Sequence, residues 1–180
     1  MKFEKVIEQP VIAAERFLLR PLRRSDVGLL NLYAGDERVA RNTTSIPHPL
    51  PPGTSENFVA RNLADDRTED VWAMDGTASG LSELLGVISL KRMDREQSEI
   101  GYWVAPAFWN TGVATEAVDA LVAANPQANR TMFAAMFQDN PASAKVLTHA
   151  GFEYIGDAEA FSVARNATVP TWTYLRKLDR

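Results

Sequence analysis

A turn that could bind phosphate lies in the middle of the chain, at Trp109, Asn110, Thr111, Gly112, Val113 and Ala114. An apolar strand ends before it at Val104, and a helix begins after it. The first N–H groups of a helix lack partners within the helix and carry partial positive charge, so they can hold a pyrophosphate without a basic side chain. Gly112 permits a tight or positive-φ turn, and Ala114 keeps the helix surface low. Alone, this pattern is weak evidence for a ligand.

Two side chains near the start of the last predicted helix are suited to chemistry. The run Asn140-Pro141-Ala142-Ser143 is typical of a helix start with proline in the first turn. The Ser143 hydroxyl is a candidate proton donor, and the alternative is an ordinary first-turn serine that bonds to the backbone. Asn140 either contacts a ligand or caps the helix with its side chain.

Two carboxylates are candidates for a general base, acting directly or through a water molecule. Glu99 lies on the predicted strand that leads to the turn, and its alternative role is that of a cross-strand partner of Lys91 or Arg92. Glu56 begins a predicted helix beside a proline-rich loop, where an acidic residue also stabilises the helix dipole. The two histidines are too far apart in sequence to suggest a metal pair, so we expect no metal site.

Hydrophobic periodicity predicts the elements that must position these residues. Strands are predicted at residues 16–22, 71–75, 84–93, 99–104, 131–137, 152–155 and 171–178. Helices are predicted at residues 27–34, 54–63, 115–124 and 141–150. The length and this mixture predict a single domain over residues 1–180, of the α/β (α+β) class.

Composition excludes several kinds of protein. The chain has no cysteine, which rules out a disulfide framework, a thiolate metal site and a cysteine nucleophile. A net charge of −4 argues against a broad nucleic-acid surface and mildly favours a cationic partner. No apolar run is long enough to span a membrane, and residues Met1–Glu8 lack the features of a secretory signal. We therefore expect a cytoplasmic protein.

Four separated motifs, in this order, resemble those of the GNAT superfamily of N-acetyltransferases, in the branch similar to ribosomal-protein-alanine N-acetyltransferases. They are Arg16–Leu22 (RFLLRPL), Glu99–Val104 (EIGYWV), Trp109–Ala117 (WNTGVATEA) and Asn140–Phe152 (NPASAKVLTHAGF). The resemblance implies a mixed, mostly antiparallel central sheet of about seven strands flanked by about four helices. It also implies splayed central strands, acetyl-CoA as co-substrate and no metal.

The resemblance also implies roles for individual residues. Backbone amides of Val104 and Ala105 would pair with the pantetheine arm, and Ser143 would protonate the leaving thiolate. The pyrophosphate loop and the start of its helix would bind the coenzyme together with Asn140, through Trp109, Asn110, Thr111, Gly112, Val113, Ala114 and Thr115. The family usually has glycine and then a basic or glutamine residue where this chain has Asn110 and Thr111, so phosphate binding is expected to depend on amides.

The function that these features favour is transfer of an acetyl group from acetyl-CoA directly to a primary amine, either a protein N-terminus or a small molecule. The alternative is an inactive acyl-CoA-binding sensor or interaction module. A nucleotide enzyme is disfavoured because the chain has neither G-x-x-x-x-G-K-[ST] nor G-x-G-x-x-G. The expected partner is a small-molecule or peptide amine, with no nucleic acid and no membrane, and a homodimer is compatible with the sequence.

Overall fold

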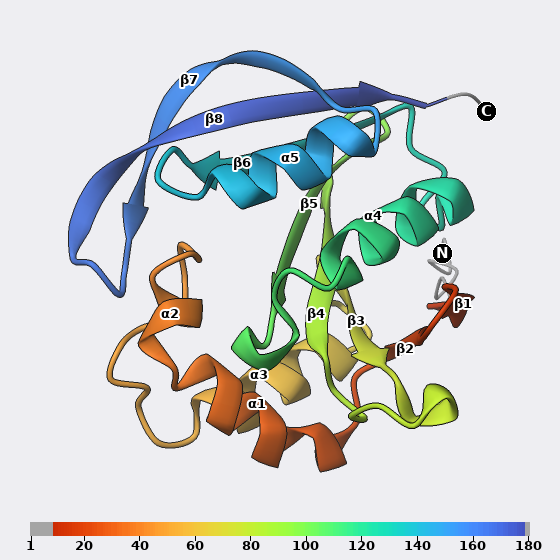
Figure 1. The fold of residues 1–180 in the computed structure, drawn as a ribbon, viewed down its shortest axis with the longest axis vertical. Helices are drawn as coiled ribbons and strands as arrows, with labels where there is room; N and C mark the ends of the chain where they lie inside the picture. Colours follow the sequence, from red (N-terminus) through yellow and green to blue (C-terminus); the bar gives the residue numbers. More distant parts are fainter. Residues whose placement is uncertain (1–8, 179–180) are drawn as a thin grey trace, which may run out of the picture.

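One eight-stranded sheet organises the chain, which a computed structural model describes over residues 9–178 (Figure 1). The expectation about Met1–Glu8 falls outside the described residues. The strands lie in the order β1-β2-β3-β4-β5-β6-β8-β7. Their bounds are β1 Ile12–Ala13, β2 Leu18–Pro21, β3 Glu69–Asp75, β4 Gly86–Met93, β5 Gln97–Val104, β6 Thr131–Phe137, β7 Glu153–Ser162 and β8 Ala167–Lys177. Only the β5–β6 pair is parallel, which confirms the mixed, mostly antiparallel sheet.

Helices cover both faces of this sheet. They are α1 Val27–Ala34, α2 Glu37–Ala40, α3 Thr54–Leu63, α4 Val113–Ala124 and α5 Pro141–His149, with 3-10 turns at Arg24–Asp26, Thr77–Ser79 and Pro106–Phe108. The larger core packs α4 and α5 against one face, and a smaller core packs α1 and α3 against the other. Within residues 9–178, no helix has the length and apolar character that a membrane crossing requires.

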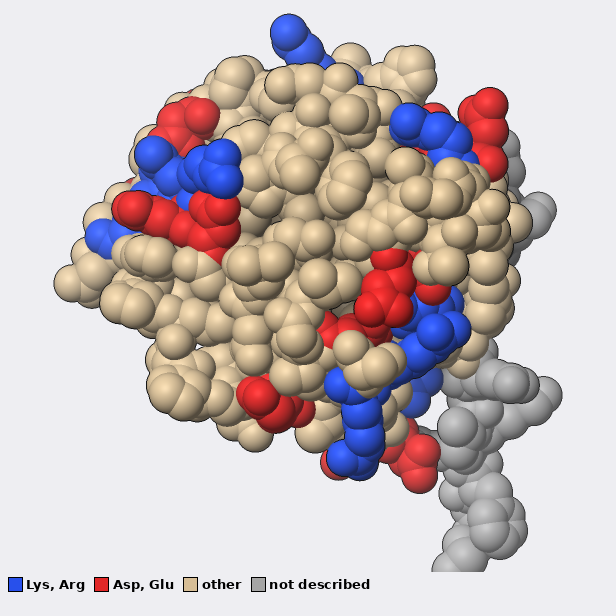
Figure 2. Space-filling view, turned by 60° about the horizontal axis from the view of Figure 1, so that its bottom comes forward, with Lys and Arg blue, Asp and Glu red and all other residues tan. Residues whose placement is uncertain are grey.

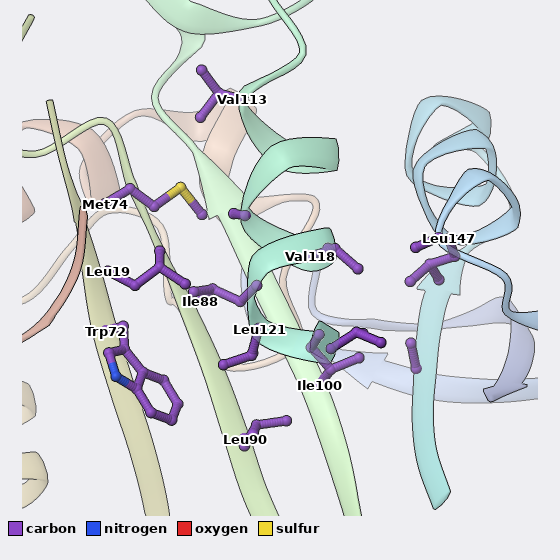
Figure 3. Close-up of a cluster of buried hydrophobic side chains, with 14 of the residues drawn as sticks. Leu19, Trp72, Met74, Ile88, Leu90, Ile100, Val113, Val118, Leu121 and Leu147 are labelled. Atoms are coloured by element: carbon purple, nitrogen blue, oxygen red, sulfur yellow. The ribbon is translucent and has the colours of Figure 1, made fainter. Parts of the chain in front are cut away.

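The larger core fixes the position of α4. Figure 3 shows Leu19, Met74 and Ile88 of three adjacent strands on the side of the helix that carries Leu121, and all four side chains are fully buried. Val118, on the other side of the helix, points toward Leu147 of α5. Each such side chain contributes roughly 1.5–3 kcal/mol by leaving water. The N-terminus of α4 is therefore held at a defined place on the sheet.

The two central strands separate soon after they meet. β5 and β6 are paired only between Gln97–Glu99 and Thr131–Phe133, whereas β6 continues against β8 along its whole length. Beyond the last shared pair, residues 100–104 and 134–137 have no ladder with each other. This divergence is the predicted splay, and it leaves an opening in the sheet.

Three predictions about the elements need correction. The sheet has eight strands rather than seven, because β1 is a two-residue strand that is too short to show periodicity. Residues 9–178 contain five α-helices where about four were expected, because the four-residue α2 was not predicted. β7 runs from Glu153 to Ser162 instead of ending at residue 155, since nearly all of its side chains are exposed and the apolar alternation that marks a strand is absent.

The turn between β7 and β8 reaches across to the segment that follows α2. The Val163 N–H donates to the Thr44 carbonyl over 3.1 Å, and Arg165 Nε donates to the Arg41 carbonyl over 2.9 Å. These bonds connect the β7–β8 turn to the segment after α2, on one side of the opening between β5 and β6.

Candidate active site

A cleft of about 580 Å³ passes through the opening between β5 and β6. Its size is within the range of small-molecule sites. On one side it is bounded by the start of α4 and the start of α5, and on the other by Val39 and Asn42 from α2 and the residues just after it. Nine of the predicted site residues line it, namely Val104, Trp109, Asn110, Gly112, Val113, Ala114, Thr115, Asn140 and Ser143.

The turn between β5 and α4 is built by a few specific bonds. Trp109 Nε1 donates to the Val104 carbonyl over 2.7 Å, which fixes the turn to the end of its own strand. Asn110 and Gly112 both have left-handed backbone conformations, with φ of 59° and 81°. Asparagine and glycine tolerate this region best, so the sequence suits the shape of the turn.

This shape leaves a row of amides free. No group within residues 9–178 accepts a hydrogen bond from the N–H groups of residues 110–115. Gly112 is the N-cap of α4 and provides no side-chain cap, so the positive end of the helix faces the cleft. Six consecutive free donors at a helix start are a suitable site for a phosphate group.

Arg16 holds the turn from the outside. Its Nη2 donates to the Thr111 carbonyl over 2.9 Å, and its Nε and backbone N donate to the Glu116 carboxylate over 2.9 and 3.1 Å. Glu116 lies in the first turn of α4, where its negative charge would oppose a bound phosphate. The pairing with Arg16 offsets that charge. Thr111 itself does not line the cleft, and its hydroxyl donates to the Phe108 carbonyl.

Ser143 and Tyr102, which both line the cleft, form a hydrogen-bonded pair. Their hydroxyl oxygens lie 2.6 Å apart, and the Tyr102 hydroxyl also lies 3.3 Å from the Ser143 carbonyl. Burial raises the pKa of Tyr102 to about 12, so the phenol keeps its proton and can donate to Ser143 Oγ. The Asn140 side chain does not cap α5, and it is free to face the cleft.

Tyr102 has no signal of its own in the sequence beyond its place in the motif Glu99–Val104. Its partner Ser143 is 41 residues away along the chain, and neither spacing nor composition indicates that the two side chains meet. The contributions of Val39 and Asn42 also had no sequence signal, because they depend on the short helix α2.

The end of β5 provides one free amide where two were expected. The Ala105 N–H donates to the Leu85 carbonyl over 2.8 Å, toward β4, and Ala105 does not line the cleft. Successive residues of a strand direct their backbone groups to opposite sides, so the Val104 N–H faces the open edge. The prediction for the Ala105 amide is therefore wrong, because β4 already occupies it.

The two candidate carboxylates lie outside the cleft lining. Glu99 is exposed and is the cross-strand partner of Lys91, on the same sheet face as Gly101 and Trp103. Glu56 is exposed in the first turn of α3. Within residues 9–178, no group of three or more acidic or histidine side chains is arranged to hold a metal ion.

Comparisons with known proteins agree with this geometry. A family model described as the acetyltransferase (GNAT) domain matches residues 16–153. The uncharacterized N-acetyltransferase YoaA of Bacillus subtilis (strain 168) is 25% identical over 156 residues, which cover 82% of this chain and 85% of the relative.

Solved structures share the fold at lower identity. The ribosomal L7/L12 N-acetyltransferase RimL in complex with coenzyme A has a TM-score of 0.79 at 19% identity, covering 94% of this chain and 99% of its own. The microcin C7 self-immunity acetyltransferase MccE, in complex with acetyl-CoA and AMP, has a TM-score of 0.78 at 15% identity, with 91% and 93% covered. The ribosomal-protein-S5-alanine acetyltransferase from Vibrio fischeri has a TM-score of 0.77 at 18% identity, with 95% and 98% covered.

Proposed function

The chain belongs to the acetyltransferase (GNAT) domain family, and on this basis we propose that it is an acetyl-CoA-dependent N-acetyltransferase that acts by direct transfer to a primary amine. The proposal treats residues 1–180 as one catalytic domain. The observation that carries it is the juxtaposition, in one cleft, of the free amides of Asn110 and residues 112–115 and the paired hydroxyls of Ser143 and Tyr102. The first set suits a pyrophosphate, and the second suits protonation of a leaving group.

The residues present fit the coenzyme. The amides of residues 110–115 and the positive end of α4 would hold the pyrophosphate, and the small side chain of Ala114 leaves room beside it. The Val104 N–H at the open edge of β5 would bind the pantetheine arm as an added strand does. Asn110 and Asn140 line the same cleft and would contribute amide side chains.

Ser143 is the proposed acid. Transfer breaks the thioester C–S bond and forms an amide C–N bond, so the departing sulfur needs a proton. The proposed arrangement has Tyr102 donating to Ser143 Oγ and the Ser143 hydroxyl donating toward the sulfur. Tyr102 then acts through Ser143, as a residue that positions its hydroxyl and can replace its proton.

Glu99 is the proposed base, acting through a water molecule. Its carboxylate is on the same face of β5 as Gly101, two residues away, which corresponds to about 7 Å along a strand. Gly101 lines the cleft and has no side chain to block the way. A bridging water would cover the remaining distance to the amine. Glu56 is the weaker candidate, because no residue of its helix α3 lines the cleft, whereas β5, which contains Glu99, lines it from Ile100 to Val104.

The test is a titration followed by a turnover assay. We expect acetyl-CoA to bind measurably by calorimetry under conditions where ATP and NAD bind more weakly, and we expect thiol release in a panel of primary amines. Tighter binding of either nucleotide would contradict the proposal. Acetyl-CoA binding without turnover on any amine would support the alternative, an inactive sensor or interaction module.

A further inference from the structure

The half of the cleft away from α4 has almost no charge. Gly101 and Trp103 of β5 and Ala135 of β6 form its floor, and Val39 and Asn42 form its wall. Within the described part of the chain, the one charged residue that lines the cleft is Lys145 of α5, which also lines a smaller pocket beside Gly112, on the coenzyme half.

This floor has no carboxylate for a second ammonium group. The nearest acidic residue on the same face of β5 is Glu99, which is the cross-strand partner of Lys91 and is also the proposed general base. An acceptor with several positive charges would give up hydration without gaining an ionic partner. An acceptor whose segment next to the amine is apolar has no second charge to desolvate, so it avoids this cost.

The rim beside this floor has a cluster of two arginines and one aspartate. Arg165 makes two hydrogen bonds to the Asp139 carboxylate, of 2.6 and 3.0 Å, and Arg41 lies 3.8 Å from the same carboxylate. Hydrogen bonding by Arg165 and the charges of both arginines lower the pKa of Asp139, so it is ionised at neutral pH. Two guanidinium groups therefore share one negative charge.

Arg41 is the accessible member of this rim cluster of Arg41, Asp139 and Arg165. Its side chain is 54% exposed, compared with 17% for Arg165. Arg41 directly precedes Asn42 and Asp139 directly precedes Asn140, and both asparagines line the cleft. The cluster is therefore directly next, along the chain, to two residues that line the cleft.

The segment before Arg41 adds one exposed negative charge, Glu37 in the first turn of α2. Arg38 lies above the Trp109 ring and pairs with Asp36 over 2.7 Å, so it adds no excess charge. In the face drawn in Figure 2, positive and negative side chains lie next to each other around a broad uncharged area. The rim thus has charges of both signs, and the net charge of −4 does not by itself identify the charge of the acceptor.

We propose that the acceptor is a primary amine with an apolar segment next to the amine and an anionic group beyond it, and that polyamines are poor substrates. The apolar floor would receive the segment, and Arg41 would receive the anionic group. This inference rests on the proposed function, because it assigns this half of the cleft to the acceptor.

The experiment compares matched acceptors. Three of the acceptors are tetrapeptide amides that begin with Ala-Leu and end in two Glu, two Gln or two Lys residues. The fourth acceptor is the polyamine spermidine. We expect kcat/KM to be about threefold higher for the Glu peptide than for the Gln peptide, with Lys and spermidine lowest, as for one exposed ion pair. At 1 M salt, where the screening length is about 3 Å, the difference should vanish.

Two variants locate the effect. Arg41→Gln should abolish the preference for Glu over Gln, whereas Arg61→Gln should retain it, since Arg61 lies over the Phe58 ring on α3, outside the cleft lining. A wild-type preference for the Lys peptide or spermidine would overturn the inference. So would an Arg41→Gln variant with an unchanged order of peptides.

Binding separates this inference from the proposed function. The same peptides are titrated by calorimetry onto protein saturated with coenzyme A. If the Glu peptide binds best but neither a peptide nor any other amine of the panel is acetylated, the acetyltransferase proposal fails and the acceptor inference stands. If acetylation occurs but follows the opposite charge order, the acetyltransferase proposal stands and the acceptor inference fails.

Discussion

The paired hydroxyls of Ser143 and Tyr102 can be tested by a double-mutant cycle. Ser143→Ala removes the proposed acid, and Tyr102→Phe removes the donor to Ser143 while keeping the aromatic ring in place. Because the two oxygens are 2.6 Å apart, the residues are expected to act as a unit. The cycle therefore predicts effects that are not additive.

The magnitudes follow from the proposed roles. A general acid contributes about 10²–10⁴-fold to a rate, and a thiolate is a good leaving group, so we expect the lower end, about a 100-fold loss of kcat for Ser143→Ala. Loss of one orienting hydrogen bond costs about 1 kcal/mol, and Tyr102→Phe should lower kcat about fivefold to tenfold. Since Tyr102 acts only through Ser143, the double variant should match Ser143→Ala, at about 100-fold rather than 1000-fold.

The assay is steady-state thiol release at saturating acetyl-CoA, with thermal unfolding of each variant as a control for folding. We expect KM for acetyl-CoA to change by less than about twofold, because neither hydroxyl is placed at the phosphates. A multiplicative loss in the double variant would refute the coupling. A Ser143→Ala enzyme whose kcat stays within about threefold of wild type would refute the acid role itself.

Four further outcomes are expected. Gly112→Val, which puts a β-branched residue at a φ of 81°, should weaken acetyl-CoA binding at least about tenfold, compared with threefold or less for Thr111→Ala; equal losses in calorimetry would contradict the placement of the loop. Arg16→Gln should weaken acetyl-CoA binding about tenfold, and neutralising its carboxylate partner as well should restore most of the affinity. The free energy of unfolding should fall by about 3 kcal/mol between pH 10 and 12, because the unfolded chain ionises Tyr102 near pH 10 and the folded chain only near 12; urea titrations of Tyr102→Phe should lack this loss. Glu99→Gln should lower kcat/KM about tenfold near neutral pH and less in alkali, where the amine is already neutral, and an equal loss at every pH would count against a base.

Local sequence patterns predicted much of the fold. The strand that ends at Val104, the turn at Gly112 and the helix after it are each determined by residues close in sequence, through apolar periodicity and the conformational freedom of glycine. The placement of nine site residues in the cleft follows from these three elements and the start of α5.

Such local patterns could not predict contacts between residues that are far apart in the sequence. Arg16 and Glu116 are 100 residues apart, and Tyr102 and Ser143 are 41 apart, so only the folded chain brings each pair together. The Ala105 error has a similar origin, because the sequence does not reveal which side of β5 an amide faces until the register with β4 is known.

The free amides of residues 110–115 affect how this protein can tolerate mutation. Every residue except proline supplies an N–H group, so the phosphate half of the cleft depends on backbone shape, and side-chain identity matters there mainly at residues that set this shape, such as Gly112, and at Arg16. The opposite half is formed by side chains such as Val39, Asn42 and Trp103. Random substitution should therefore change which amine is accepted long before it abolishes coenzyme binding, and a library confined to residues 39 and 42 is the shortest route to new acceptors.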